Sequence, residues 1–157
     1  MISFSISALE KAPVRKDGVL PGEFLDLAPE DAFAPAGEVE YDLTAALVSG
    51  GVLVSGKAAA KVNSVCGRCL QDIEITIANP ALHIFFEIDE NQEILEVDEE
   101  LRAELLLELP MNPLCDPDCA GLCPVCGSDL NKKNCKCTPV DSAAKVSPWS
   151  ALDELDL

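Results

Sequence analysis

The sequence LCDPDCAGLCPVCG occupies residues 114–127, and Cys-Lys-Cys follows at residues 135–137. Six of the eight cysteines therefore lie within 23 residues, and the other two form a single pair upstream, Cys66 and Cys69. Eight thiols are the number that two closed tetrahedral metal sites require. We therefore expect two structural zinc ions, each held by four cysteines.

The cysteine spacing divides the eight thiols into two groups of four. Cys123-Pro-Val-Cys126-Gly is typical of a zinc knuckle, in which the proline stiffens the loop and the glycine lets backbone N–H groups turn toward sulfur. Cysteines two residues apart on an extended segment point to the same side, so the last two complete this site: Cys123, Cys126, Cys135 and Cys137. The second predicted site takes the remaining four: Cys66, Cys69, Cys115 and Cys119.

Hydrophobic periodicity predicts a sheet before the cysteine-rich region. Apolar residues alternate at 2–6, at 39–47 and at 52–62, and each range predicts a strand. Ser49-Gly50-Gly51, between the second and third ranges, marks a hairpin turn. Further strands are expected at 73–77 and 82–88. Prolines and glycines interrupt residues 10–36, which we expect to be an irregular connection. The upstream cysteine pair then lies in the turn between the second hairpin strand and the next strand.

Residues 98–109 change to a helical period, with Leu101, Leu105 and Leu109 on one stripe and Pro110 at the end. If this helix packs antiparallel to its neighbouring strand, its end reaches Cys66 and Cys69. The predicted fold is α+β, an antiparallel β-meander with one packed helix and a C-terminal cysteine-rich zinc-knuckle lobe. We place the sheet domain at 1–110, the zinc lobe at 111–140, and a tail with a short amphipathic helix, carrying Trp149, Leu152 and Leu155, at 141–157.

The charge of the chain is strongly acidic. Its 157 residues contain 28 acidic and 11 basic side chains, and residues 65–110 alone have a net charge of −10. Such a surface repels phosphate and attracts basic proteins. Four cations lie beside the cysteines in the sequence: Arg68, Lys132, Lys133 and Lys136. We interpret them as neutralising thiolate charge, and we do not expect direct RNA binding by this chain alone.

Several other uses of the cysteines fit less well. The Cys66-Gly-Arg-Cys69 pair could serve thiol-dependent redox chemistry or metal sensing, but a redox pair of this kind needs a following helix, and Ile73-Glu-Ile-Thr-Ile predicts a strand. The Cys119, Cys123 and Cys126 spacing also occurs in iron–sulfur enzymes with a much larger barrel. All-thiolate sites lack the open position of catalytic zinc, so we expect no enzyme.

The N-terminus lacks the uninterrupted apolar block of a signal peptide, and no apolar run approaches the roughly 20 residues of a membrane span. We therefore expect a cytoplasmic protein with no membrane association. In that compartment thiols stay reduced, which favours metal sites over disulfides.

Three motifs resemble the YceD family of large ribosomal RNA subunit accumulation proteins. They are the Cys66-x-Arg-Cys69-Leu turn, the LPMNPLC segment at 109–115, and the run from Cys119 to Asn131 with the terminal Cys-x-Cys. The resemblance implies a cytoplasmic bacterial protein that is needed for normal levels of large-subunit ribosomal RNA, and the family has no known catalytic activity to transfer to this chain. Members are often encoded beside a small, basic zinc-ribbon protein of the large subunit. The expected partner is therefore a basic ribosomal protein of the large subunit or a pre-ribosomal particle.

Overall fold

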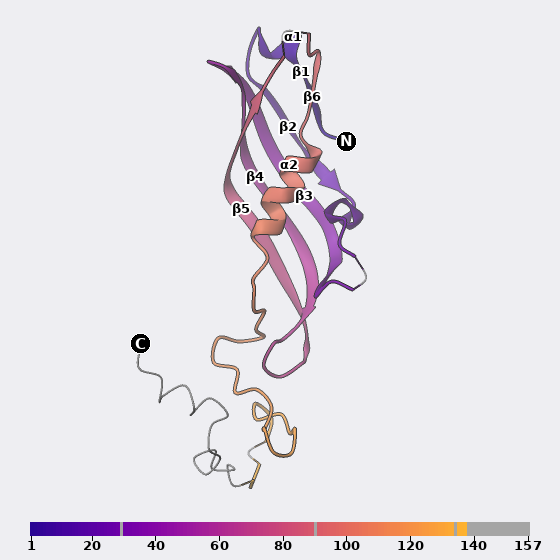
Figure 1. Cartoon of the computed structure of the whole chain (residues 1–157), viewed down its shortest axis with the longest axis vertical. Helices are drawn as coiled ribbons and strands as arrows, with labels where there is room; N and C mark the ends of the chain where they lie inside the picture. Colours follow the sequence, from indigo (N-terminus) through magenta and orange to yellow (C-terminus); the bar gives the residue numbers. More distant parts are fainter. Residues whose placement is uncertain (29, 90, 134, 138–157) are drawn as a thin grey trace, which may run out of the picture.

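The computed structural model describes residues 1–28, 30–89, 91–133 and 135–137. Its main element is an antiparallel sheet with the strand order β2-β3-β4-β5, and β1 pairs separately with β6 (Figure 1). The elements in chain order are β1 (Ser3–Ser5), α1 (Ile6–Leu9), β2 (Val14–Leu20), the 3-10 helix η1 (Gly22–Leu25), β3 (Phe33–Val48), β4 (Gly51–Val65), β5 (Asp72–Glu87), β6 (Ile94–Glu96) and α2 (Asp98–Leu107). The structure confirms the predicted α+β fold with a meander, one main helix and a cysteine-rich C-terminal region.

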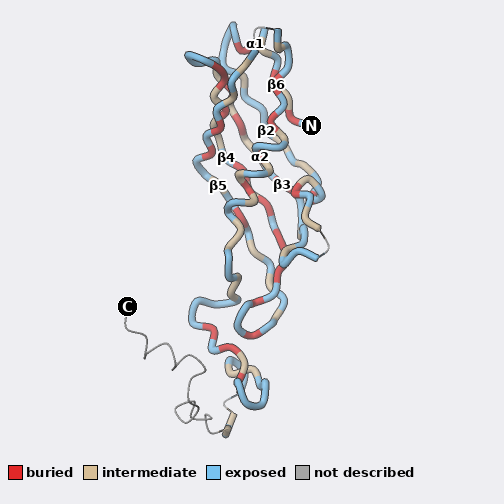
Figure 2. Tube along the Cα trace, in the orientation of Figure 1, coloured by how far each residue is buried: buried red, intermediate tan, exposed pale blue. Residues whose placement is uncertain are grey.

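The core lies between α2 and one face of the sheet. Alternate residues of β3 and β4 are buried on this face, as a period of two requires, and they include Leu43 and Val54. Leu101 and Leu105 of α2 are completely buried against them. Figure 2 shows the buried positions alternating along the long strands and the exposed face of α2. The residues of β3 and β4 on the opposite face are mostly exposed or half-buried.

The structure corrects four details of the sequence prediction. Residues 10–36 contain a strand, β2, and the helix η1. The strands expected at 73–77 and 82–88 are one continuous strand, β5, which passes through Pro80. The first strand ends at Ser5, and Ile6 begins α1. The helix α2 ends at Leu107, two residues earlier than predicted, because Glu108 and Leu109 continue with turn hydrogen bonds to Leu105 and Leu106.

The opposite directions of β5 and α2 position the cysteines. β5 leaves the Cys66–Cys69 turn at its start, and α2, which packs against β5, returns the chain toward that turn. Gly67 N donates a hydrogen bond to Pro113 O over 2.8 Å, which joins the returning segment to the turn. The cysteine-rich lobe thus projects from one end of the long sheet (Figure 1). The predicted tail helix lies outside the described residues, and no described helix is long and apolar enough to cross a membrane.

Candidate metal centres

The eight cysteines meet in two separate groups of four. Within each group the sulfur atoms all lie within 4.8 Å of one another. The groups have the membership that the spacing predicted, Cys66, Cys69, Cys115 and Cys119 in group 1 and Cys123, Cys126, Cys135 and Cys137 in group 2. Group 1 is the more enclosed, since three of its cysteines are buried and only Cys115 is exposed.

The sulfur separations fit a tetrahedral ion. Zinc–sulfur bonds of about 2.3 Å place the corners of a tetrahedron about 3.8 Å apart. In group 1, Cys66 Sγ lies 3.9 Å from Cys119 Sγ, and Cys69 Sγ lies 3.6 Å from Cys115 Sγ. A disulfide would need about 2.05 Å. The donor set is thiolate only, which zinc accepts, so both groups can hold a zinc ion.

Group 1 is built where the β4–β5 turn meets the segment after α2. Cys66, Cys69 and Cys119 form a small apolar cluster with Ile73 and Leu114. Arg68 adds two hydrogen bonds between the β4–β5 turn and the segment after α2. Its guanidinium Nη1 donates to the carbonyl oxygens of Pro117 and Cys119 over 3.1 and 3.0 Å. The sequence interpretation of Arg68 as a neutralising charge missed this role in holding the chain.

The turns of the two groups share one backbone geometry. In group 1, Leu70 N donates to Cys66 O over 3.0 Å, and Cys66 N donates to Gln71 O over 2.8 Å. In group 2, Gly127 N donates to Cys123 O over 2.9 Å, and Cys123 N donates to Ser128 O over 2.8 Å. The residue after the second cysteine is left-handed in both, with φ of 59° at Leu70 and 71° at Gly127. Both turns are therefore knuckles, although only the second has the predicted glycine.

Short contacts join the two groups to each other. Leu122 and Asp129 form an antiparallel bridge, and Leu122 N also donates to Arg68 O over 3.2 Å. The Asn131 side chain accepts from Ala120 N over 2.8 Å and donates to Cys119 Sγ over 3.3 Å. Group 2 is thus anchored on the residues that surround group 1. The Gly-x-Asp-Leu-Asn run at 127–131 was part of the recognised motif, but spacing alone gave no role for it.

The thiol pKa values within each group are pushed apart. Backbone hydrogen bonding, first from Cys69, lowers the pKa of Cys66 to about 6. Side-chain hydrogen bonding with Cys119 and Cys69 raises the pKa of Cys115 to about 12. In group 2, the hydroxyl of Ser128, 3.1 Å from the sulfur, lowers the pKa of Cys126 to about 6, and Cys126 raises that of Cys137 to about 12. Crowded thiolates repel one another, and a divalent cation removes that repulsion.

The carboxylate oxygen Oδ2 of Asp129 has two polar partners near the groups. Lys132 Nζ lies 3.3 Å from Asp129 Oδ2, and Gln71 Nε2 donates to the same oxygen over 3.3 Å. The only histidine, His83, lies on β5, where its Nδ1 is 2.8 Å from Ala81 O, and it belongs to neither cysteine group.

The sequence of this chain is similar to one protein-family model and to several known proteins. The model of the family described as Large ribosomal RNA subunit accumulation protein YceD matches residues 54–156. An uncharacterized protein of Mycobacterium tuberculosis is 33% identical over 132 residues, covering 74% of this chain and 61% of that protein. One of Mycobacterium leprae is 30% identical over 127 residues, 72% of this chain and 56% of that protein. The chain therefore spans about three fifths of the length of these relatives.

A shorter match concerns a plant protein. The Large ribosomal RNA subunit accumulation protein YCED homolog 1, chloroplastic, of Arabidopsis thaliana is 34% identical over 60 residues, which cover 38% of this chain and 19% of the plant protein. No solved structure matches the chain significantly.

Proposed function

The chain belongs to the YceD family of large ribosomal RNA subunit accumulation proteins, and on this basis we propose that it is a non-enzymatic zinc-binding factor for assembly of the large ribosomal subunit. It would bind two structural zinc ions and a basic ribosomal protein, either free or in a pre-ribosomal particle. The observation that carries the zinc proposal is the pair of four-sulfur groups with separations of 3.6 and 3.9 Å in group 1.

The role proposed for zinc is structural. Each group offers four thiols and no histidine or carboxylate, so a bound ion has no open position for water or substrate. Zinc binding at such sites is coupled to folding and contributes roughly 10–16 kcal/mol in zinc-finger peptides. The lobe has one described isolated bridge, Leu122–Asp129, and depends on ligands rather than on a large core for its stability.

The partner proposal rests on charge. The net charge is −17, and the segment from the end of β5 through α2 presents exposed acidic side chains to solvent. Those that make no described hydrogen bond or ion pair include Glu93, Glu96, Glu99 and Glu100. A surface of this charge disfavours polyanionic RNA and favours a basic protein, which it could shield before assembly.

The experiment compares capture of a purified small, basic zinc-ribbon protein of the large subunit by three variants. Glu93, Glu96, Glu99 and Glu100 are changed together to Gln; the matched control removes the same charge elsewhere, at the exposed Glu23, Glu30, Glu38 and Glu40. We expect the first set to slow association about tenfold or more at low salt and the control to have a smaller effect. Lys132/Lys133→Gln should leave capture unchanged. Tight binding of naked ribosomal RNA that the lysine changes abolish would contradict the proposal.

The alternative is a thiol-dependent redox or metal-sensing protein using Cys66 and Cys69. The low pKa of Cys66, about 6, favours thiolate chemistry. However, the turn leads into β5 and not into a helix, and both sulfurs are buried within group 1. Metal analysis of protein purified under reducing conditions distinguishes the redox form of this alternative from the structural-zinc proposal, because only the redox form expects free thiols without bound metal.

A further inference from the structure

Leu70 has a backbone conformation that its side chain makes unfavourable. Its φ is 59°, in the left-handed region, where a Cβ atom crowds the following carbonyl. The equivalent residue of the other knuckle is glycine, Gly127, which adopts the same conformation without that cost. The knuckle fold therefore needs no leucine at this position.

The side chain of Leu70 also contributes nothing described to the core. It is 65% exposed and belongs to neither buried cluster of the described residues. A strained backbone that carries a large exposed apolar side chain indicates a function other than folding. Contact with another molecule is the function that an exposed leucine can serve.

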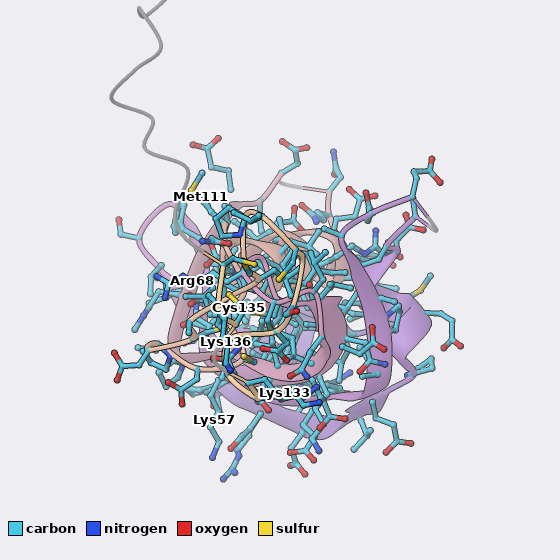
Figure 3. All side chains as sticks on the ribbon, turned by 90° about the horizontal axis from the view of Figure 1, so that it is seen from below. Lys57, Arg68, Met111, Lys133, Cys135 and Lys136 are labelled. Atoms are coloured by element: carbon cyan, nitrogen blue, oxygen red, sulfur yellow. The ribbon has the colours of Figure 1, made fainter. Side chains whose placement is uncertain are left out.

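A second exposed apolar side chain lies on the neighbouring segment. Met111 is fully exposed, and the segment that carries it is held against the group 1 turn by the Gly67 N to Pro113 O hydrogen bond. The approach is close, because a Cβ added at Gly67 would lie 2.2 Å from Asn112 Oδ1. Figure 3 views this end of the molecule, with Met111 and Arg68 labelled. Two adjacent segments thus each present one apolar side chain.

We propose that Leu70 and Met111 are apolar anchors that hold the protein partner, a basic protein of the large ribosomal subunit with an apolar surface beside its cations. This inference rests on the proposed function. The acidic segment would govern the rate of encounter, and the anchors, buried on binding, would govern the rate of dissociation. Aliphatic side chains stack poorly on bases, and the net charge of −17 opposes phosphate, so the chemistry favours protein over RNA.

The test uses the full chain loaded with zinc and the purified small, basic zinc-ribbon protein of the large subunit. The variants are Leu70→Gly, Leu70→Asn and Met111→Ser, and the control is Val19→Ser, an exposed apolar residue on the distant edge strand β2. Association and dissociation rates, zinc content and Tm are measured for each. Asn tolerates the left-handed conformation, so it removes the apolar side chain without adding strain.

We expect Leu70→Gly to keep two zinc ions, to have a Tm at or above that of the unaltered protein, and to dissociate about tenfold faster with unchanged association. Leu70→Asn and Met111→Ser should also dissociate faster, and Val19→Ser should not. Unchanged dissociation in all three variants, or loss of zinc or Tm in Leu70→Gly, overturns the anchor assignment.

Three outcomes separate the anchor proposal from the proposed function. If the unaltered chain does not bind the ribosomal protein at all, the proposed function fails and the anchors fail with it. If the unaltered chain binds but the anchor variants weaken only the binding of naked large-subunit RNA, the anchors contact RNA and the protein assignment is wrong. Equal binding of the ribosomal protein by every variant leaves the proposed function intact and removes the anchors alone.

Discussion

Asn131 Nδ2 lies 3.3 Å from Cys119 Sγ, so a residue in the loop of group 2 donates a hydrogen bond to a thiol of group 1. The same amide nitrogen donates to Asp129 Oδ1 over 2.9 Å, and Asn131 Oδ1 accepts from Ala120 N over 2.8 Å. Hydrogen bonds of this kind orient metal ligands and stabilise thiolate charge. The two groups are therefore linked directly through one side chain.

Replacing Asn131 by Asp tests this link. A carboxylate at this position accepts but does not donate, and its charge repels the thiolate of Cys119. We expect zinc affinity at group 1 to fall about 10- to 100-fold, the usual effect of removing a ligand's hydrogen-bond partner. Competition with a chromogenic chelator measures the affinity, and Lys133→Gln is the control. An unchanged affinity would show that the 3.3 Å contact has no energetic role.

Replacing Cys126 by Ser should remove one zinc ion of two and leave the sheet folded. Cys126 is exposed, and the main core cluster of the described residues contains no group 2 cysteine. We therefore expect the free energy of unfolding of the sheet to be independent of the ion bound by group 2. Native mass spectrometry gives the metal count, and far-ultraviolet circular dichroism monitors the sheet. Eight titratable thiols and no metal in the unaltered protein, prepared reduced and with zinc supplied, would contradict the zinc proposal.

The sequence predicted the strands that have a clear alternation and missed two others, the three-residue strand β6 and the longer strand β2. β2 is an edge strand whose residues are mostly exposed and include Arg15, Lys16 and Gly18, so the period of two is weak. At Gly18 an added Cβ would lie 2.9 Å from the Tyr41 hydroxyl, so the Tyr41 side chain would have to shift. Such a contact depends on tertiary structure and cannot be deduced from the local sequence.

The other main error in the predicted fold was the division of β5 into two strands, which Pro80 suggested. Proline is tolerated in β5 because this strand is at the edge of the sheet, where no outer neighbour needs its N–H. Asn79 Oδ1 accepts from Ala81 N over 3.1 Å, which satisfies a donor at the irregularity between Gly56 and Ala58 of the paired strand. The sequence shows the proline but not the edge position.

The grouping of the cysteines could be predicted because it depends on few features. Group 2 follows from short-range spacing, whereas group 1 needed the direction of α2 relative to β5. Arg68 and Leu70 could not be assigned, because the guanidinium contacts and a positive φ at a non-glycine residue depend on the folded backbone.

The ion pair between Arg15 and Asp42 gives a pH prediction for the sheet. Arg15 Nε and Nη2 donate to the two carboxylate oxygens over 2.7 and 2.9 Å, and this hydrogen bonding lowers the pKa of Asp42 below its ordinary 3.8. The pair therefore stabilises the fold above pH about 4, and its contribution is lost as the pH falls through the lowered pKa. Urea unfolding should show Asp42→Asn to be less stable at pH 7, with the difference narrowing below pH 4. A difference independent of pH would contradict the assignment.

Cys66→Ser should destabilise the protein more than Cys137→Ser. Cys66 is completely buried beside Ile73 and Leu114, at the junction between the sheet and the segment after α2, whereas Cys137 is only partly buried in the terminal lobe. A serine hydroxyl in the buried site adds about 1–3 kcal/mol of desolvation cost to the loss of the ligand. Thermal unfolding of both variants measures the difference. Equal losses would argue against metal binding that joins Cys66 and Cys69 to Cys115 and Cys119.

Alanine at Gly121 should weaken the lobe more than alanine at Gly127, although both residues have left-handed φ values, 74° and 71°. At Gly127 an added Cβ meets no atom within 4 Å, so only the conformational cost of about 1 kcal/mol applies. At Gly121 the added Cβ lies 3.1 Å from Arg68 O, and Arg68 cannot easily move because its guanidinium is bonded to Pro117 O and Cys119 O and its own carbonyl accepts from Leu122 N. The total cost there should reach about 2–3 kcal/mol. The rate of zinc release to a chelator measures both, and equal rates would show that Arg68 does not fix this part of the chain.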